Sequence, residues 1–109
     1  MGLPHAQPGQ VINLLQHLEG VAPSKTTAIV KEDWFEVIRL RIRAGEAIPE
    51  HKTKGPITVQ CLEGKVVFNV DQKDHTLSPN SWLYLKGGQK HSLKGIEDSL
   101  LLLTIVFQH

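Results

Sequence analysis

Short runs of apolar and β-branched residues follow one another along most of the chain, from Thr26 to Phe107. Glycine, proline, asparagine and charged residues interrupt these runs at intervals of about eight to twelve positions. No long internal segment has the periodicity of an amphipathic helix. This rhythm is typical of antiparallel sandwiches and barrels, so the pattern predicts an all-β domain.

The expected strands are bounded by turn residues and cover residues 26–30, 34–43, 57–62, 65–70, 75–77, 81–85, 91–94 and 99–107. In the second run, Ile38, Leu40 and Ile42 alternate with three arginines, so one face of that strand should belong to the core. The two-residue link Glu63-Gly64 contains a glycine that can adopt positive φ. We therefore expect the two runs that flank this link to pair as an antiparallel hairpin.

The N-terminal region has a different pattern. Residues 1–10 contain two prolines and two glycines and predict a disordered leader. In the next segment, Val11, Leu14, Leu15 and Leu18 have helical spacing, whereas Val11 and Ile12 equally suit a strand. We expect a short N-terminal strand or helical turn there. Because 109 residues leave room for one core, residues 11–109 should form a single barrel domain.

Composition narrows the classes of partner. The net charge of +1 gives no general attraction to nucleic acid or to an anionic membrane, so we expect neither as a partner. The longest apolar run, residues 100–107, is too short to cross a bilayer, and no signal-peptide pattern is present at the start. The single cysteine, Cys61, cannot form an internal disulfide and suits a reducing compartment. We therefore expect a cytoplasmic protein.

Two stretches of sequence carry a more specific signal. In the first, Gly45 stands six positions before His51, and Gly64 closes the stretch; the second runs from Asn80 to Gly88 and His91. Together they resemble the two motifs of the cupin superfamily, and the short spacing between them resembles that of small single-domain bacterial cupins. The resemblance implies an RmlC-like barrel, a small double-stranded β-helix of two antiparallel sheets. It also implies a homodimer in which the N-terminal segment pairs with the partner's sheet; the alternative is that the segment covers its own barrel.

The resemblance also identifies the positions that bind a divalent metal in the family. These positions hold His51, Thr53, Ile57 and His91. An isoleucine cannot coordinate a metal and a threonine hydroxyl is a poor ligand, whereas zinc sites usually keep three protein ligands and the iron triad needs a carboxylate. We therefore expect a degenerate site with no tightly bound cofactor, at which His51 and His91 bind zinc, manganese, nickel or iron weakly.

The same barrel geometry predicts a pocket around His51 and His91. If Ile57 points inward, strand alternation turns Val59 and Cys61 inward as well, although Cys61 is expected to be buried without reactivity. Trp82 or Tyr84 could form a wall of this pocket. Four lysines flank the two histidine segments and would favour an anionic ligand: Lys52, Lys54, Lys86 and Lys90.

Function is less constrained than fold. The first hypothesis is a small-molecule-binding module for sensing or sequestration, because no nucleophile motif, carboxylate pair or full metal set is present. The second is an enzyme: a metal-dependent dioxygenase or isomerase with an incomplete ligand set, or a metal-free epimerase that uses His51 or His91 as a base. The third is a purely structural domain of a larger assembly.

Overall fold

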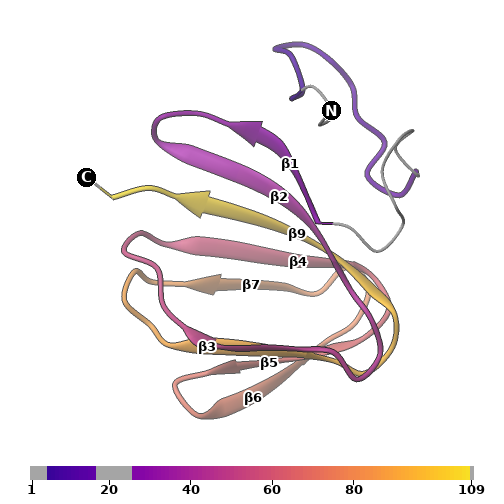
Figure 1. The fold of residues 1–109 in the computed structure, drawn as a ribbon, viewed down its shortest axis with the longest axis vertical. Coiled ribbons are helices and arrows are strands. Elements are labelled where there is room, and N and C mark those ends of the chain that lie inside the picture. Colours follow the sequence, from indigo (N-terminus) through magenta and orange to yellow (C-terminus); the bar gives the residue numbers. More distant parts are fainter. Residues whose placement is uncertain (1–4, 17–25, 109) are drawn as a thin grey trace.

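Two antiparallel β-sheets face one another and enclose the core (Figure 1). The computed structural model describes residues 5–16 and 26–108. Its strands are β1 (Thr27–Lys31), β2 (Phe35–Ile42), β3 (Ala47–His51), β4 (Ile57–Glu63), β5 (Val66–Val70), β6 (Lys73–Leu77), β7 (Trp82–Leu85), β8 (His91–Gly95) and β9 (Ser99–Val106). One sheet has the order β1-β2-β9-β4-β7 and the other the order β3-β8-β5-β6. The predicted all-β barrel of two antiparallel sheets is confirmed.

The core lies between the sheets and is built from alternate residues of each strand. On β4, Ile57, Val59 and Cys61 are at most 2% exposed, while the intervening residues are more exposed. On β5 of the opposite sheet, Val66 and Phe68 are buried in the same way. The period-two pattern therefore turns one face of each sheet inward, as the sequence indicated for β2 and β4.

The strand β3 was not predicted. Its sequence, Ala-Ile-Pro-Glu-His, has only one half-buried position, Ile48, and carries Pro49 at its centre. Proline is tolerated because β3 lies at the edge of its sheet, where its pairing with β8 has a register irregularity between Ile48 and His51. An edge strand with a proline and a bulge has no clear alternation, which is why the pattern missed it.

The predicted hairpin of β4 and β5 is wrong. β4 pairs with β7 and β9 in one sheet, whereas β5 pairs with β6 and β8 in the other. Gly64 has a φ of 84°, so it does make a sharp turn, but the turn carries the chain from one sheet to the other. A Cβ atom at this position would collide with the backbone of Asp98 and with Ser99. Gly64 is therefore a crossing point between sheets.

The N-terminal segment lies against its own sheet within the chain. The amide of Ala6 donates to the Ile29 carbonyl at 2.8 Å, and the Arg39 guanidinium donates to the carbonyls of Leu14 at 2.8 Å and Gln16 at 3.2 Å. Arg39 is on the outer face of β2, as its alternation predicted, yet it is only 3% exposed. The covering segment is the reason for this burial.

The expected N-terminal strand or helical turn is absent from residues 11–16, which form only a turn and a bend. The side chain of Asn13 accepts a hydrogen bond from the Leu15 amide at 3.1 Å, which competes with helix formation. Residues 5–10, part of the expected disordered leader, contain a turn closed by the Gln10 amide and the Gln7 carbonyl. Leu18 and residues 1–4 lie outside the described residues. Swapping of this segment between subunits stays a prediction.

In the described part of the chain, no helix has the length and apolar character needed to cross a membrane.

Gly64→Ala should cost about 3 kcal/mol or more of the free energy of unfolding, because positive φ and the collision with Asp98 and Ser99 act together. Gly45→Ala is the matched control: its φ is 81°, but nothing lies within 4 Å of an added Cβ, so it should cost only about 1–2 kcal/mol. Chemical denaturation of both variants measures the difference. Equal losses would show that the crossing point tolerates a side chain.

Candidate functional site

Two histidines meet at one end of the barrel interior. His51 ends β3 and His91 begins β8, and the two residues are register partners in the antiparallel pair. Their Nε2 atoms are 3.1 Å apart and their ring planes are inclined at 64°. His91 is 4% exposed, whereas His51 is exposed. The pair therefore spans the boundary between the core and the solvent, at the end where Ile57 begins β4.

Each imidazole is held by the same local hydrogen bond. The Nδ1 atom of His51 lies 3.0 Å from the Pro49 carbonyl oxygen, and that of His91 lies 3.1 Å from the Gln89 carbonyl oxygen. In both cases the carbonyl belongs to the residue two positions earlier, and a carbonyl oxygen can only accept. Both Nδ1 atoms therefore carry hydrogen and donate it, which fixes the orientation of each ring.

The deeper ring is packed against an aromatic neighbour. Phe68 stacks on His91 with a centroid distance of 5.7 Å and an interplanar angle of 18°. Burial lowers the pKa of His91; the hydrogen bond to Gln89 opposes this effect, and the nearby His51 lowers the pKa further. His91 is therefore favoured in its neutral form, which keeps one nitrogen lone pair available.

The other two positions of the family's metal set do not supply ligands. The hydroxyl of Thr53 donates to the Gly55 carbonyl at 2.9 Å, and Ile57 is an apolar residue only 2% exposed. Among the described residues, no group of three or more His, Cys, Asp or Glu side chains is placed to hold a metal ion. Two nitrogens 3.1 Å apart can reach one ion with bonds of about 2.1 Å, but two ligands do not make a resident site. The side chains present do not fit a tightly held metal.

Val59 and Cys61 belong to the core rather than to the histidine site. Both are fully buried on β4, and Cys61 lies four residues beyond Ile57, roughly 13 Å along the strand. Its thiol lies 3.4 Å from the Glu63 carbonyl, and burial raises its pKa. A raised pKa disfavours the thiolate, which is the form that binds a metal or acts as a nucleophile.

Trp82 and Tyr84 face away from the barrel interior, so their predicted place in the pocket wall is wrong. They pair with Gln60 and Thr58, which lie between the inward residues of β4. Trp82 is 61% exposed and Tyr84 is 52% exposed. The register of β7 on β4, which the sequence did not reveal, decides this orientation.

Glu36 is a candidate that the sequence interpretation missed. It pairs with Ile105, the register partner of Ile57, and it shares a face of β2 with Ile38 and Leu40. The alternation used to place that face in the core extends back to Glu36 and could have identified it. The half-buried Glu36 therefore lies on the core-facing side of β2, toward the end of the sheet where Ile57 begins β4, with Lys31 as its register partner on β1.

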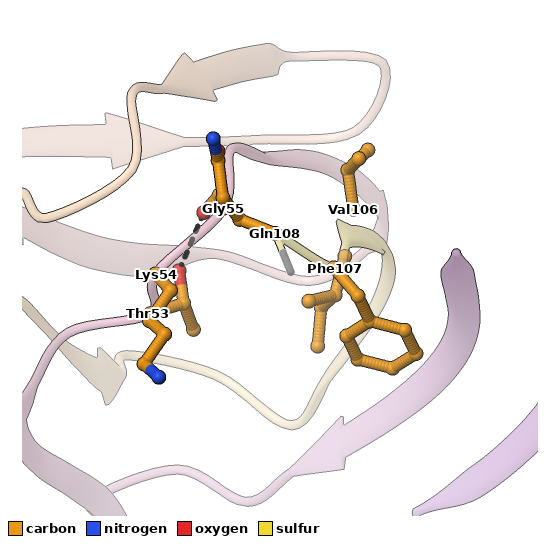
Figure 2. A pocket seen from close by; sticks show the side chains of 7 residues that line it. Thr53, Lys54, Gly55, Val106, Phe107 and Gln108 are labelled. Carbon is orange, nitrogen blue, oxygen red and sulfur yellow. Dashed lines mark hydrogen bonds between the residues drawn. The ribbon is translucent and has the colours of Figure 1, made fainter. Parts of the chain in front are cut away.

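A pocket of about 400 Å³ opens beside the loop that follows His51 (Figure 2). It is lined by Thr53, Lys54, Gly55, Ile105, Val106, Phe107 and Gln108. The loop is held down because the Gly88 amide donates to the Thr53 carbonyl at 2.7 Å. Gly55 lies so close to the Val106 carbonyl that any larger residue would collide with it. This volume is within the range of small-molecule sites.

The four lysines of the predicted positive rim, Lys52, Lys54, Lys86 and Lys90, are all exposed. Lys54 also contributes to the lining of the 400 Å³ pocket. Their attraction for an anionic ligand stays a prediction.

Solved structures share this arrangement of strands. A conserved protein of unknown function from Streptococcus pyogenes superposes with a TM-score of 0.81 at 18% identity, covering 100% of this chain and 96% of that chain. A cupin superfamily protein from Desulfitobacterium hafniense gives 0.77 at 19% identity, covering 99% and 97%. An RmlC-like cupin from Desulfovibrio desulfuricans gives 0.75 at 21% identity, covering 89% and 95%.

These likenesses show that the protein is a small barrel with the cupin fold. No family model and no curated protein sequence matches the chain. The fold is therefore the common property, and the function has to be argued from the residues of this chain.

Acidification should destabilise the protein partly through His91. Because its pKa is lowered by folding, the unfolded chain binds a proton more readily, so stability is lost as the pH falls below about 6.5, the usual histidine value. His91→Asn keeps a donor for the Gln89 carbonyl and removes the titration. Denaturation at pH 7.5 and 5.5 should show a smaller loss for this variant than for the wild type.

His75→Asn is the control for that comparison, because His75 lies exposed on β6. It should lose the same stability on acidification as the wild type. If His91→Asn also behaves like the wild type, burial of His91 does not oppose its protonation.

Proposed function

We propose that the protein is a small-molecule-binding module whose site is the open end of the barrel at His51 and His91. The observation that carries this proposal is the pair itself: two oriented imidazoles with Nε2 atoms 3.1 Å apart, one buried and one exposed. The two Nε2 atoms contact each other rather than the backbone, so a ligand can exchange partners with them without breaking a strand hydrogen bond. Such a pair is suited to contact a ligand.

The neighbouring features support a ligand of modest size. Phe68 stacks on His91, and Leu93, the register partner of Phe68, continues the apolar surface into the core. Small-molecule sites usually combine a few polar groups with a mainly apolar lining. Sensing and sequestration both require only that the site bind a small molecule.

Equilibrium dialysis against an extract of cellular metabolites below 1 kDa tests this function. Wild-type protein should enrich at least one compound, detected by mass spectrometry, and His51→Asn/His91→Asn should lose at least tenfold of that enrichment while its melting temperature changes little. His75→Asn, changed at an exposed residue of the edge strand β6, should enrich the compound like the wild type. Absence of enrichment, or equal enrichment by the double variant, would contradict binding at this site.

Metal addition separates binding from the alternative of a metal-dependent dioxygenase or isomerase. With two imidazoles and no third ligand among the described residues, zinc, nickel, manganese or iron should bind weakly. After treatment with a chelator and return of one equivalent of metal, elemental analysis should find far less than one ion per chain, and the melting temperature should rise by less than about 2 °C. A full equivalent with a large rise would favour the metalloenzyme.

A further inference from the structure

Four edge strands bound the two sheets in the described part of the chain, and three of them are protected against further pairing. β1 is bonded by the N-terminal segment, because the Ala6 amide donates to the Ile29 carbonyl at 2.8 Å. β3 contains Pro49 and an irregular register with β8, and β6 bears the charged residues Lys73 and Asp74. Covering segments, prolines, irregularities and charges are the means by which proteins keep edge strands from pairing with other chains.

The fourth edge strand, β7, has none of these features (Figure 1). Its sequence, Trp-Leu-Tyr-Leu, contains no charge and no proline, and its register with β4 is unbroken. Two of its side chains, Trp82 and Tyr84, are large, apolar and more than half exposed on the outer face of the sheet. An apolar strand with an unprotected edge is suited to pair with another extended chain.

The backbone of β7 leaves two residues able to form hydrogen bonds outward. The Cys61 amide donates to the Ser81 carbonyl at 2.9 Å, so Ser81 directs this carbonyl toward β4. Because backbone groups alternate along an antiparallel strand, Leu83 also faces β4, while Trp82 and Tyr84 direct their N–H and C=O groups away from it. No other described strand pairs with this edge. β7 therefore presents two donors and two acceptors to a partner.

These groups are complementary to the same strand of a second copy. In an antiparallel pair with Leu83 opposite Leu83 of the second copy, each Trp82 lies opposite the Tyr84 of the other chain. Each such pair of residues exchanges two hydrogen bonds, so every outward group of the two aromatic residues is used. A shift by two residues in either direction places one of them opposite Asn80 or Lys86, outside the strand. One register is therefore favoured, and it has two-fold symmetry.

Side chains favour the same register. Trp82 and Tyr84 lie on the outer face, so each ring lies beside a ring of the second copy, and aromatic cross-strand pairs stabilise antiparallel sheets. Lys86, the first charged residue after β7, lies opposite Asn80 of the second copy, so like charges do not meet. With only four residues on each side, the contact should bury less than about 1,200 Å², so association should be weak.

We propose that β7 is a docking strand for a second copy of this chain, which joins the two five-stranded sheets edge to edge into one continuous sheet. Trp82 and Tyr84 supply both the hydrogen bonds and the aromatic contacts. They face away from the barrel interior, so this surface is separate from the site at His51 and His91 and does not depend on the proposed binding function. The interface also differs from the N-terminal pairing that the resemblance implied.

Sedimentation velocity of the full chain from about 5 to about 500 µM measures the association. The wild type should shift from monomer toward dimer over this range. Tyr84→Pro removes an outward N–H and spares the bonds to β4, and Trp82→Lys adds a charge at the contact, so each should raise the dissociation constant at least tenfold. Trp34→Lys is the matched control: Trp34 is 62% exposed but lies between β1 and β2, and this variant should dimerise like the wild type.

Disulfide formation tests the position of the two-fold axis. Leu83→Cys brings two thiols together at a non-hydrogen-bonded pair, where Cα atoms lie about 4.5 Å apart, within disulfide range. Ser81→Cys points to the same side of the strand, but in this register its two copies lie about 13 Å apart along the strands. Under mild oxidation, Leu83→Cys should form a covalent dimer on non-reducing electrophoresis and Ser81→Cys should not. The native Cys61 is buried in both variants.

The outcomes decide between a second copy and other occupants of the edge. A wild type that stays monomeric at the highest concentration would overturn the proposal and leave β7 to a different extended chain. A dimer that neither Tyr84→Pro nor Trp82→Lys weakens would also contradict it, because the copies would then meet elsewhere, such as at the N-terminal segment. Melting temperatures show which variants fold, and Trp82→Lys decides alone if Tyr84→Pro does not. Failure of ligand binding at the histidines leaves this proposal unchanged.

Discussion

The apolar layer between the two sheets is the constraint on which the rest of the structure depends. Alternate residues of β4, β5, β8 and β9 meet there, and the buried positions form one continuous cluster. Because side chains alternate strictly along a strand, burying this layer fixes the register of every strand that contributes to it. On β8, the inward positions are His91, Leu93 and Gly95. The same alternation that builds the core therefore places an imidazole at one end of it.

His91 thus occupies a core position with a polar side chain, and its surroundings show how this is tolerated. Phe68 covers one face of the ring, and the Gln89 carbonyl satisfies Nδ1. Only Nε2 lacks a backbone partner, and it points to the partner ring on β3. A hydrophobic residue here would extend the core at no such cost, so the imidazole is the departure from simple core packing that indicates a function.

Much of the fold could be predicted from the sequence, because the rhythm of strands and turns depends on local residue types. Strand alternation also predicted correctly that Val59 and Cys61 point inward together with Ile57, although we had expected all three to line a pocket. The pairing of strands did not follow: Gly64 was correctly identified as a turn, but a turn glycine does not reveal whether the next strand joins the same sheet. The error at Trp82 and Tyr84 has the same origin, since a shift of one residue in register would turn both inward.

The two histidines of the site could be predicted from the sequence, but their hydrogen bonds could not. The resemblance of two motifs to those of cupins implied that His51 and His91 lie together, but it said nothing of the carbonyl oxygens of Pro49 and Gln89, which decide the tautomers. Glu36 escaped notice because a charged residue at the start of an apolar strand is usually solvated.

The tautomers also bear on the catalytic alternative. A neutral Nε2 can act as a base, and the exposed His51 is the better candidate, because burial makes the cationic form of His91 costly. A base that removes a proton from carbon needs a group that stabilises the resulting negative charge, and such groups are donors or cations. The donors closest to the pair are directed elsewhere: the Nδ1 atoms of both histidines and the Thr53 hydroxyl donate to backbone carbonyls. At the four positions that bind a metal in the family, Ile57 has no donor, and the others are already used within the chain, so these side chains offer no group to stabilise an anionic intermediate, which argues against base catalysis at this site.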